Sequence, residues 1–448
     1  MNQITQHDEW FLWGATLVTM DSQLRIISDG VITIQRGKIT KIESNPNFIP
    51  PAHVFHLNAQ GCLVMPGLIN GHTHVGMSLL RGIANDLPLY DWLNQHIFPL
   101  ERELGNKDFV SLGSQLASIE MIRGGITLFN DMYYFEEAAA EEVHKIGLRA
   151  ICGQTHIEIS GVEKSSDVIK KFDQFFEHLD SYPLVEGALA PHSIYGLSET
   201  LWRELVRYAA SKSLILHTHL CETQEEVEKI RRERGLSPVE WFDSIGLFDQ
   251  KAICAHAVEL SSSDIKILGK KQVGVVYNPE SNLKLGNRIC PVVDLRLEGS
   301  RVAFGTDSTA SNNNLNLLAE ADVGTKLQVL KYGVGQLKAV DAVKMLTIEG
   351  AKALHMDALT GSLEMGKSAD LIVLEINKPH CVPIFDWYSH LIYSSQQSDV
   401  RDTIVAGRIL MRDRNLTTVD ENSVLQQAKD MGKKVATMSA MLQSSKAN

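Results

Sequence analysis

The chain has 448 residues, of which 44% are hydrophobic and 22% charged, and its formal net charge is −11 at pH 7. This composition is typical of a globular protein with one large domain and a smaller one. The acidic balance and the lack of a long basic run argue against a nucleic-acid or anionic-membrane partner. No apolar stretch approaches the roughly 20 residues that a membrane-spanning helix needs.

The beginning of the chain and its cysteines indicate a cytoplasmic protein. The first residues, MNQITQHDEWFLWG, lack the basic segment and apolar core of a signal peptide. The six cysteines are scattered and form no CxxC pair. We therefore expect reduced thiols rather than a disulfide framework or a structural zinc knuckle.

Short strands are predicted near both ends of the chain. Residues 31–44 alternate apolar and polar side chains around Arg36-Gly37, which is typical of a β-hairpin. Residues 361–376 and 402–413 have the same character. We expect a small β-sandwich domain built from residues 1–64 and 361–420, followed by a C-terminal helix and tail over residues 421–448.

The middle of the chain alternates apolar strand candidates with helical patterns. The strand candidates are not amphipathic, which suits strands buried on both faces. They cover residues 62–70, 125–131, 148–153, 185–191, 214–219, 252–256, 273–278 and 301–307. Eight such strands alternating with helices predict an α/β fold, a (β/α)8 TIM-like barrel over residues 65–360.

Enzymes with this fold place their active sites at the carboxyl ends of the strands. The first strand ends in His72 and His74, whose side chains point the same way on an extended segment. Later strand ends carry further metal-ligand or acid–base residue types: His217, His219, Glu222, His256 and Asp307. Each has an ordinary alternative as a loop or core residue, but their convergence predicts a site for a divalent ion such as Zn²⁺.

An ion with an open coordination position lowers the pKa of bound water toward neutrality. Asp307 is then predicted both to bind the ion and to accept a proton from the water. Glu222 follows His219 by three residues and is suited to carry a proton to the substrate, while His256 can orient the nucleophile or assist as a base. The alternative for Glu222 is an acidic residue at the start of the next helix, where the helix dipole stabilises it.

Four segments carry a resemblance to a known family. PGLINGHTHVGMSLLRGIANDLPLYDWL, HLCET, NPESNLKLG and GTDSTASNNNLNL resemble the amidohydrolase superfamily, and most closely its bacterial 5-methylthioadenosine/S-adenosylhomocysteine deaminases. The resemblance covers nearly the whole chain. It implies that an adenine amino group is replaced by oxygen with release of ammonia. The metal ligands that it implies are His72, His74, His219 and Asp307.

The resemblance also implies roles around the substrate. Glu222 would contact the purine and move protons, and His256 would lie beside the reactive water. Glu101 would bind the ribose hydroxyls, His192 would bind substrate, and Trp92 would cover the purine. A homodimer or homotetramer is expected.

One ion per subunit is expected, because related barrels hold two ions with a bridging lysine and no lysine lies between Ser181 and Thr200. Zn²⁺ is the first expectation, with Fe²⁺ or Mn²⁺ as alternatives.

Three positions depart from the family pattern. Gln154 stands where an arginine for the homocysteine carboxylate is expected, and no arginine follows until Arg203. This favours uncharged 5′-substituents, although Lys164, Lys170 and Lys171 are alternative point charges on a predicted helix face. Tyr277 and Ser308 replace the family's histidine and glycine and are expected near the site.

Two other functions stay open from the sequence. The first is deamination of another heterocycle such as guanine, a pterin, cytosine or an s-triazine. Glu101 argues for a nucleoside because a free base has no diol to bind. The second is a catalytically inactive paralogue acting in assembly, which the retained ligand set disfavours.

Overall fold

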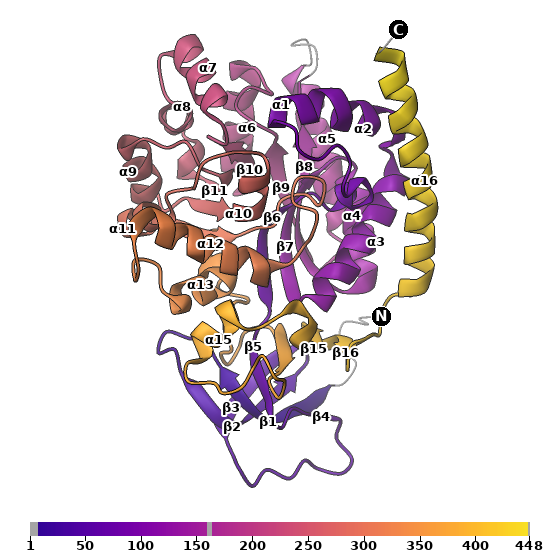
Figure 1. Ribbon diagram of the computed structural model, residues 1–448, viewed down its shortest axis with the longest axis vertical. Helices are drawn as coiled ribbons and strands as arrows, with labels where there is room; N and C mark the ends of the chain where they lie inside the picture. Colours follow the sequence, from indigo (N-terminus) through magenta and orange to yellow (C-terminus); the bar gives the residue numbers. More distant parts are fainter. Residues whose placement is uncertain (1–7, 159–163, 447–448) are drawn as a thin grey trace.

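The computed structural model describes residues 8–158 and 164–446, and within them the chain forms two sheets (Figure 1). Eight parallel strands form the barrel, with neighbours in chain order. They are β6 (Leu68–Thr73), β7 (Ile126–Tyr133), β8 (Arg149–His156), β9 (Val185–Pro191), β10 (Ile215–Leu220), β11 (Lys251–His256), β12 (Gly274–Tyr277) and β13 (Arg301–Phe304). The predicted fold class is confirmed.

The barrel is closed between its last and first strands. A parallel bridge joins Thr73 to Asp307, just beyond the end of β13. The Asp307 N–H donates to the carbonyl oxygen of His72 at 2.9 Å. The closing contact therefore also places two of the predicted metal ligands side by side.

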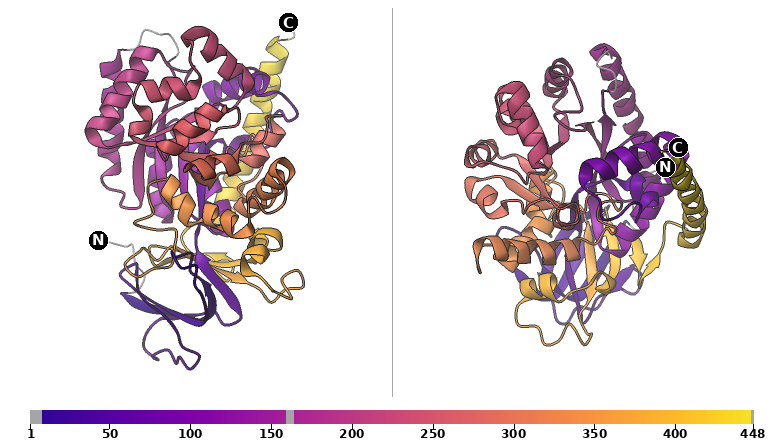
Figure 2. Two further views of the ribbon diagram at one scale, coloured as in Figure 1. Left: turned by 90° about the vertical axis from the view of Figure 1, so that its left-hand side faces the viewer. Right: turned by 45° about the horizontal axis from the view of Figure 1, so that its top comes forward.

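Helices surround the strands, as the right-hand view of Figure 2 shows. At least one helix follows each strand, which is the alternation that buried parallel strands require. In chain order they are α3 (Lys107–Arg123), α4 (Glu136–Ile146), α5 (Ser165–Leu179), α6 (Glu199–Lys212), α7 (Gln224–Arg234), α8 (Pro238–Ser244), η3 (Leu247–Asp249), α9 (Ser262–Lys270), α10 (Pro279–Lys284), α11 (Val292–Glu298), α12 (Leu317–Tyr332), α13 (Ala339–Leu346) and α14 (Ile348–Ala353).

A longer connection follows β6 and lies over the carboxyl end of the barrel. It consists of four short helical segments before α3. They are η1 (Val75–Leu80), α1 (Leu89–Trp92), the π-helical turn η2 (Leu93–Ile97) and α2 (Phe98–Leu104). This connection carries Trp92 and Glu101 toward the predicted site.

The second sheet is built from both ends of the chain, below the barrel in Figure 1. Its strands are β1 (Glu9–Val18), β2 (Ile26–Gln35), β3 (Lys38–Ser44), β4 (His56–Asn58), β5 (Cys62–Pro66), β14 (Leu371–Glu375), β15 (Val400–Val405), β16 (Arg408–Arg412) and β17 (Asn415–Leu416). The β2–β3 hairpin bends back onto the segment before β14, where the Ile39 N–H donates to the Lys367 carbonyl. The sheet thereby encloses a core of its own, which includes Trp10, Leu17 and Leu371.

The predicted strand over residues 62–70 is divided between the two sheets. β5 pairs with β14 of the terminal sheet, and β6 pairs with β7 of the barrel. The break falls at Gly67, where a Cβ atom would lie 2.0 Å from Thr127 Oγ1, so only glycine fits. The sequence pattern missed this division because both strands are apolar and fully buried.

The C-terminal part differs from the prediction in one place. Only Leu371–Glu375 of the predicted strand 361–376 is a strand, while the hairpin over 402–413 is present as β15 and β16. α15 (Trp387–Tyr393) and η4 (Gln397–Asp399) lie between them. The predicted C-terminal helix is α16 (Glu421–Lys446), which runs along the barrel beside α3 (Figure 1). Residues 1–7 and 447–448 of the predicted terminal segments lie outside the described residues. No described helix is long and apolar enough to cross a membrane.

A buried ion pair joins the barrel to the terminal sheet. Arg149, at the start of β8, donates from Nε to Asp370 Oδ2 at 2.9 Å and from Nη2 to Ser368 Oγ at 2.9 Å. The Asp370 side chain is 0% exposed and also accepts from the Ala406 N–H at 2.7 Å. Burial alone would raise the pKa of Asp370, but Arg149 holds it below its usual range.

Replacing Arg149 by methionine is expected to lower the free energy of unfolding by about 3–5 kcal/mol, because the Asp370 carboxylate would be buried without its cation. Urea denaturation followed by circular dichroism measures this loss. The double variant Arg149→Met/Asp370→Asn removes the charge and keeps an acceptor for Ala406, so it should recover part of the loss. A double variant no more stable than the single one would show that the unpaired charge is not the cause.

Candidate active site

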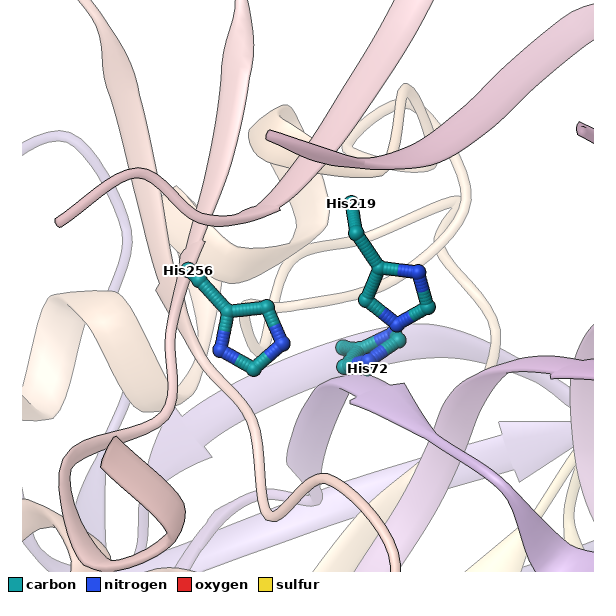
Figure 3. A group of neighbouring side chains, drawn as sticks. All are labelled: His72, His219 and His256. Atoms are coloured by element: carbon teal, nitrogen blue, oxygen red, sulfur yellow. The ribbon is translucent and has the colours of Figure 1, made fainter. Parts of the chain in front are cut away.

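Four strands bring imidazoles and carboxylates together at the carboxyl end of the barrel. His72 lies in β6 and His74 directly follows it, His219 lies in β10, His256 ends β11, and Asp307 follows β13. Figure 3 shows three of these imidazoles, those of His72, His219 and His256, converging. Ligand atoms of His72, His219 and His256 lie within 4.8 Å of one another, and so do those of His72, His74 and Asp307. Because His72 belongs to both groups of ligand atoms, the two groups form one site.

Backbone and side-chain acceptors fix the orientation of three of these imidazoles. His74 Nδ1 contacts the Met132 carbonyl, and His219 Nδ1 lies 2.7 Å from the His192 carbonyl. His256 Nδ1 lies 2.9 Å from Asn282 Oδ1. Because an oxygen of this kind can only accept, each Nδ1 donates its proton to that oxygen, which leaves each Nε2 directed at the site.

His72 has the most buried of the candidate ligand atoms. Its Nδ1 lies 3.0 Å from His217 Nε2, so His217 stands behind the site and supports His72. Its Nε2 is buried, makes no hydrogen bond, and lies 3.5 Å from Asp307 Oδ1. An unsatisfied buried nitrogen facing a carboxylate is a costly arrangement that a bound cation would relieve. The residues present therefore fit a divalent metal ion.

Asp307 is held with one oxygen toward the histidines. Its Oδ1 lies 3.5 Å from His72 Nε2 and 3.3 Å from His74 Nε2. Its Oδ2 accepts from Ser281 Oγ at 2.5 Å and from Ser311 Oγ at 2.9 Å. The two serines orient the carboxylate and leave Oδ1 as the ligand atom.

The protonation states agree with metal ligation. Burial lowers the pKa of His72 to about 3 and that of His219 well below its usual range, so both are neutral at pH 7. Burial alone would lower the pKa of His74, but Asp307 raises it to about 8. Burial alone would likewise raise the pKa of Asp307, but His72 and His74 hold it well below its usual range. A metal ion would replace the proton shared between these groups.

Glu222 lies beside His256 at the edge of this cluster. Its Oε2 is 3.9 Å from His256 Nε2, and its Oε1 accepts from Asn287 Nδ2 at 3.3 Å. Glu226 holds the turn by accepting from the Cys221 and Glu222 N–H groups at 3.1 and 3.0 Å. Burial raises the pKa of Glu222, which favours its protonated form relative to an exposed glutamate.

Backbone strain occurs at the same strand ends. His256 has a φ of 73° and Asp307 a φ of 57°, both in the left-handed region. Such conformations cost about 1–3 kcal/mol in residues other than glycine and concentrate at functional sites. They turn both side chains from the strand direction toward the common centre.

The remaining predicted residues line a cavity over the cluster. Glu101, His192 and Trp92 are all part of its wall. Glu101 Oε1 accepts from Tyr133 Oη at 2.6 Å, and burial raises the pKa of Glu101 to about 7. The cavity has a volume of about 60 Å³, so side chains that cover it, such as Trp92 and Leu285, must move to admit a purine.

Two of the three departures from the family pattern lie close to this space, and Tyr277 does not. Ser308 lines the cavity. Tyr277 is buried on the outer side of β12, where it packs on Phe304 and its hydroxyl accepts from Gln328 Nε2 at 3.3 Å. Its expected place near the site is wrong, because alternate residues of a strand face opposite sides. Gln154 lines a second cavity next to this one. Residues 159–163, which follow it in the chain, lie outside the described residues.

Sequence reasoning missed the groups that orient the site. These supports are Tyr133, Ser281, Asn282 and Ser311, whereas His217 was expected at a strand end but not as the support of His72. Tyr133 follows the predicted strand 125–131, and Ser281 and Asn282 lie in the segment NPESNLKLG. Polar residues just beyond strand ends were therefore the available signal.

Comparisons with known proteins agree with this geometry. The amidohydrolase family profile matches residues 63–410. A 5-methylthioadenosine/S-adenosylhomocysteine deaminase of Thermodesulfovibrio yellowstonii is 37% identical over 92% of this chain and 95% of its own length. A 5′-deoxyadenosine deaminase of Methanothermobacter thermautotrophicus is 39% identical over 83% of this chain and 87% of its own length.

A solved structure is similar over almost the whole length. The zinc-bound adenosine deaminase of Xanthomonas campestris superposes with a TM-score of 0.91 at 29% identity, covering 96% of this chain and 98% of that one. The profile, the relatives and the architecture agree with one another. The chain belongs to the amidohydrolase family.

Proposed function

We propose that this protein is an adenine nucleoside deaminase, which hydrolyses the amino group from the 6 position of the purine in a metal-dependent reaction. The observation that carries the proposal is the convergence of His72, His74, His219 and Asp307 beside a separate acid, Glu222. The relatives named as deaminases of methylthioadenosine and 5′-deoxyadenosine support the same substrate class. The products are the inosine analogue and ammonia.

His72, His74, His219 and Asp307 would hold the metal ion, and we propose one Zn²⁺ per subunit. A zinc ion supplies a water molecule with a pKa near 7 and so a nucleophile at neutral pH. The zinc-bound adenosine deaminase of similar fold supports the choice of metal. β9 carries no lysine that could bridge a second ion.

Glu222 and its neighbours then carry the proton transfers. The raised pKa of Glu222 suits it to donate a proton to the purine ring as the nucleophile attacks C6. The Asp307 carboxylate accepts the proton that the nucleophile loses, and the two serines on Oδ2 keep Oδ1 directed at it. His256 orients the nucleophile through Nε2, since Asn282 fixes its Nδ1 proton.

Glu101 and His192 would bind the sugar. The Glu101 carboxylate can accept hydrogen bonds from a ribose diol, and Tyr133 holds it in place. Trp92 lies over the cavity and would stack on the purine. These contacts favour a nucleoside over a free base such as guanine, which has no diol.

Ammonia release from the zinc-loaded full-length protein tests the proposal. Methylthioadenosine, adenosine, S-adenosylhomocysteine and guanine are compared at equal concentration. Turnover of adenine nucleosides is the expected result, and turnover of guanine alone would contradict the substrate class. The chelated protein is the control and should be inactive.

The pKa of Glu101 gives a pH prediction. Glu101 is ionised above about pH 7 and protonated below it, so kcat/KM for adenosine should fall as the pH drops through this region. The Tyr133 hydrogen bond favours the ionised form, so Tyr133→Phe should move the midpoint of this fall to higher pH. The pH profile of kcat/KM measures both. An unchanged acidic limb in Glu101→Gln would assign it to another group.

The cytoplasmic location and the homodimeric or homotetrameric assembly stay predictions from the sequence. Fe²⁺ or Mn²⁺ in place of Zn²⁺ is an alternative that metal analysis of the purified protein decides.

A further inference from the structure

A second, much larger cavity adjoins the metal-site cavity. Its volume is about 810 Å³, within the range of sites that bind drug-sized ligands. The two cavities share wall residues, so they lie directly beside each other. The shared residues are Phe98, Glu101, Tyr133, Tyr134 and Thr155.

Glu101 fixes how a nucleoside would span this space. Its carboxylate lies in the wall common to both cavities. With C6 of the purine at the metal site and the ribose hydroxyls at Glu101, the 5′ position is directed to the large cavity. A methylthio group fills only a small part of such a volume.

The wall of the large cavity is mainly apolar and aromatic. It is formed by α2, the start of α3, the segment after β7, and one face of α5. The apolar residues from these elements are Phe98, Val110, Tyr134, Phe135, Val168, Phe172 and Phe175. Val168, Phe172 and Phe175 are also core residues, exposed by only 1%, 2% and 5%, so this surface is rigidly packed. An apolar group placed here would be removed from water.

Among the described residues of the wall, Arg102 and Lys171 are the only arginine or lysine side chains. Gln154, which stands where the family has an arginine, is uncharged; its Oε1 accepts from the Glu136 N–H at 3.2 Å, and its Nε2 donates to the Thr155 carbonyl at 3.3 Å. Arg102 and Lys171 belong to the wall but are exposed. A charged amino-acid substituent would have to bury its carboxylate against apolar rings, which is costly.

We propose that this cavity is a subsite for large apolar 5′-substituents, so that the preferred substrates are adenine nucleosides with bulky alkylthio or arylthio groups. The inference rests on the proposed deaminase function and specifies its substrate class. The purine would lie at the metal site and the ribose hydroxyls at Glu101, while the 5′-substituent would pack on α5 and α2. Selectivity would come from burial of apolar area rather than from a charge pair.

The test compares kcat/KM of the zinc-loaded full-length enzyme for four substrates: 5′-deoxyadenosine, methylthioadenosine, 5′-benzylthio-5′-deoxyadenosine and S-adenosylhomocysteine. The benzylthio compound is expected to exceed 5′-deoxyadenosine by about tenfold or more, because its ring is buried. S-adenosylhomocysteine is expected to be the poorest of the thioethers.

Variants that fill the cavity provide the second arm. Val168→Phe reduces its volume from the buried side, and Gln174→Trp reduces it from the exposed rim, which keeps the test open if the core change prevents folding. In either variant the ratio of benzylthio to 5′-deoxyadenosine kcat/KM should fall about tenfold. Lys170→Phe places an aromatic ring on α5 outside the cavity wall, and the ratio should not change.

The outcomes separate this inference from the function on which it rests. Turnover of 5′-deoxyadenosine with loss of activity as the substituent grows would overturn the subsite and leave the deaminase function standing. Preference for S-adenosylhomocysteine would overturn the apolar character. An unchanged ratio in the folded cavity-filling variants would show that the substituent lies elsewhere. No turnover of any adenine nucleoside would overturn both.

Discussion

Glu222→Gln is expected to lower kcat by about 10²–10⁴-fold, the usual contribution of a positioned general acid. Glutamine keeps the size of the side chain and its acceptor for Asn287 Nδ2, but it has no acidic proton to deliver to the purine. Metal content and nucleoside binding should stay close to those of the wild type, because Glu222 lies beside the metal cluster rather than within it.

Steady-state kinetics and metal analysis measure these two properties separately. Glu225→Gln is the matched control: it is the same change three residues further on, at an exposed position in the first turn of α7. It should behave as wild type. Wild-type turnover in Glu222→Gln would remove the residue from proton transfer, and loss of the metal would show that it is a ligand instead.

His72→Ala is expected to lose the bound metal and with it essentially all activity. His72 belongs to both groups of converging ligand atoms and is 0% exposed, so its loss leaves the remaining side chains without the ligand that they share. Removing one of four ligands typically weakens metal binding by several powers of ten when the others cannot rearrange, and support residues alone account for about 10–100-fold.

Metal analysis of the purified variant after dialysis measures the loss. His355→Ala is a suitable control, since His355 follows α14 near the amino end of β11, at the opposite end of the barrel. It should keep one ion per subunit. Full occupancy in folded His72→Ala would exclude His72 from the ligand set.

The sequence was sufficient for the barrel because its signals are local. Fully apolar strand segments, each followed by a helix, predict β7 to β13 within a few residues. The position of His72, His74, His219, His256 and Asp307 at strand ends then follows from the fold, since parallel strands present their carboxyl ends to one side. Charge and residue type were enough to predict a metal there.

Other features depend on contacts between distant segments and could not be predicted. The change of sheet at Gly67 is set by Thr127, which is 60 positions further along the chain. The supports of Asp307 come from Ser281 and Ser311, whose hydroxyls resemble any other serine in sequence. Tyr277 was misplaced because one residue of register decides which side of β12 it faces.

The size of the large cavity is the feature furthest from the sequence. Its wall combines α2, β7 and α5, and each contributes aromatic residues that read as ordinary core. The sequence has Gln154 where the family has an arginine, and this predicted only that the homocysteine carboxylate would bind weakly. The volume and the apolar lining follow from how these elements pack.

The most direct test of the account is the isotopic product of methylthioadenosine in ¹⁸O-enriched water, measured by mass spectrometry with the zinc-loaded and the chelated protein. The account predicts methylthioinosine carrying one solvent oxygen, with an equal amount of ammonia, from the zinc-loaded protein alone. Release of free adenine, or no product from a protein with full metal occupancy, would contradict hydrolytic deamination at C6.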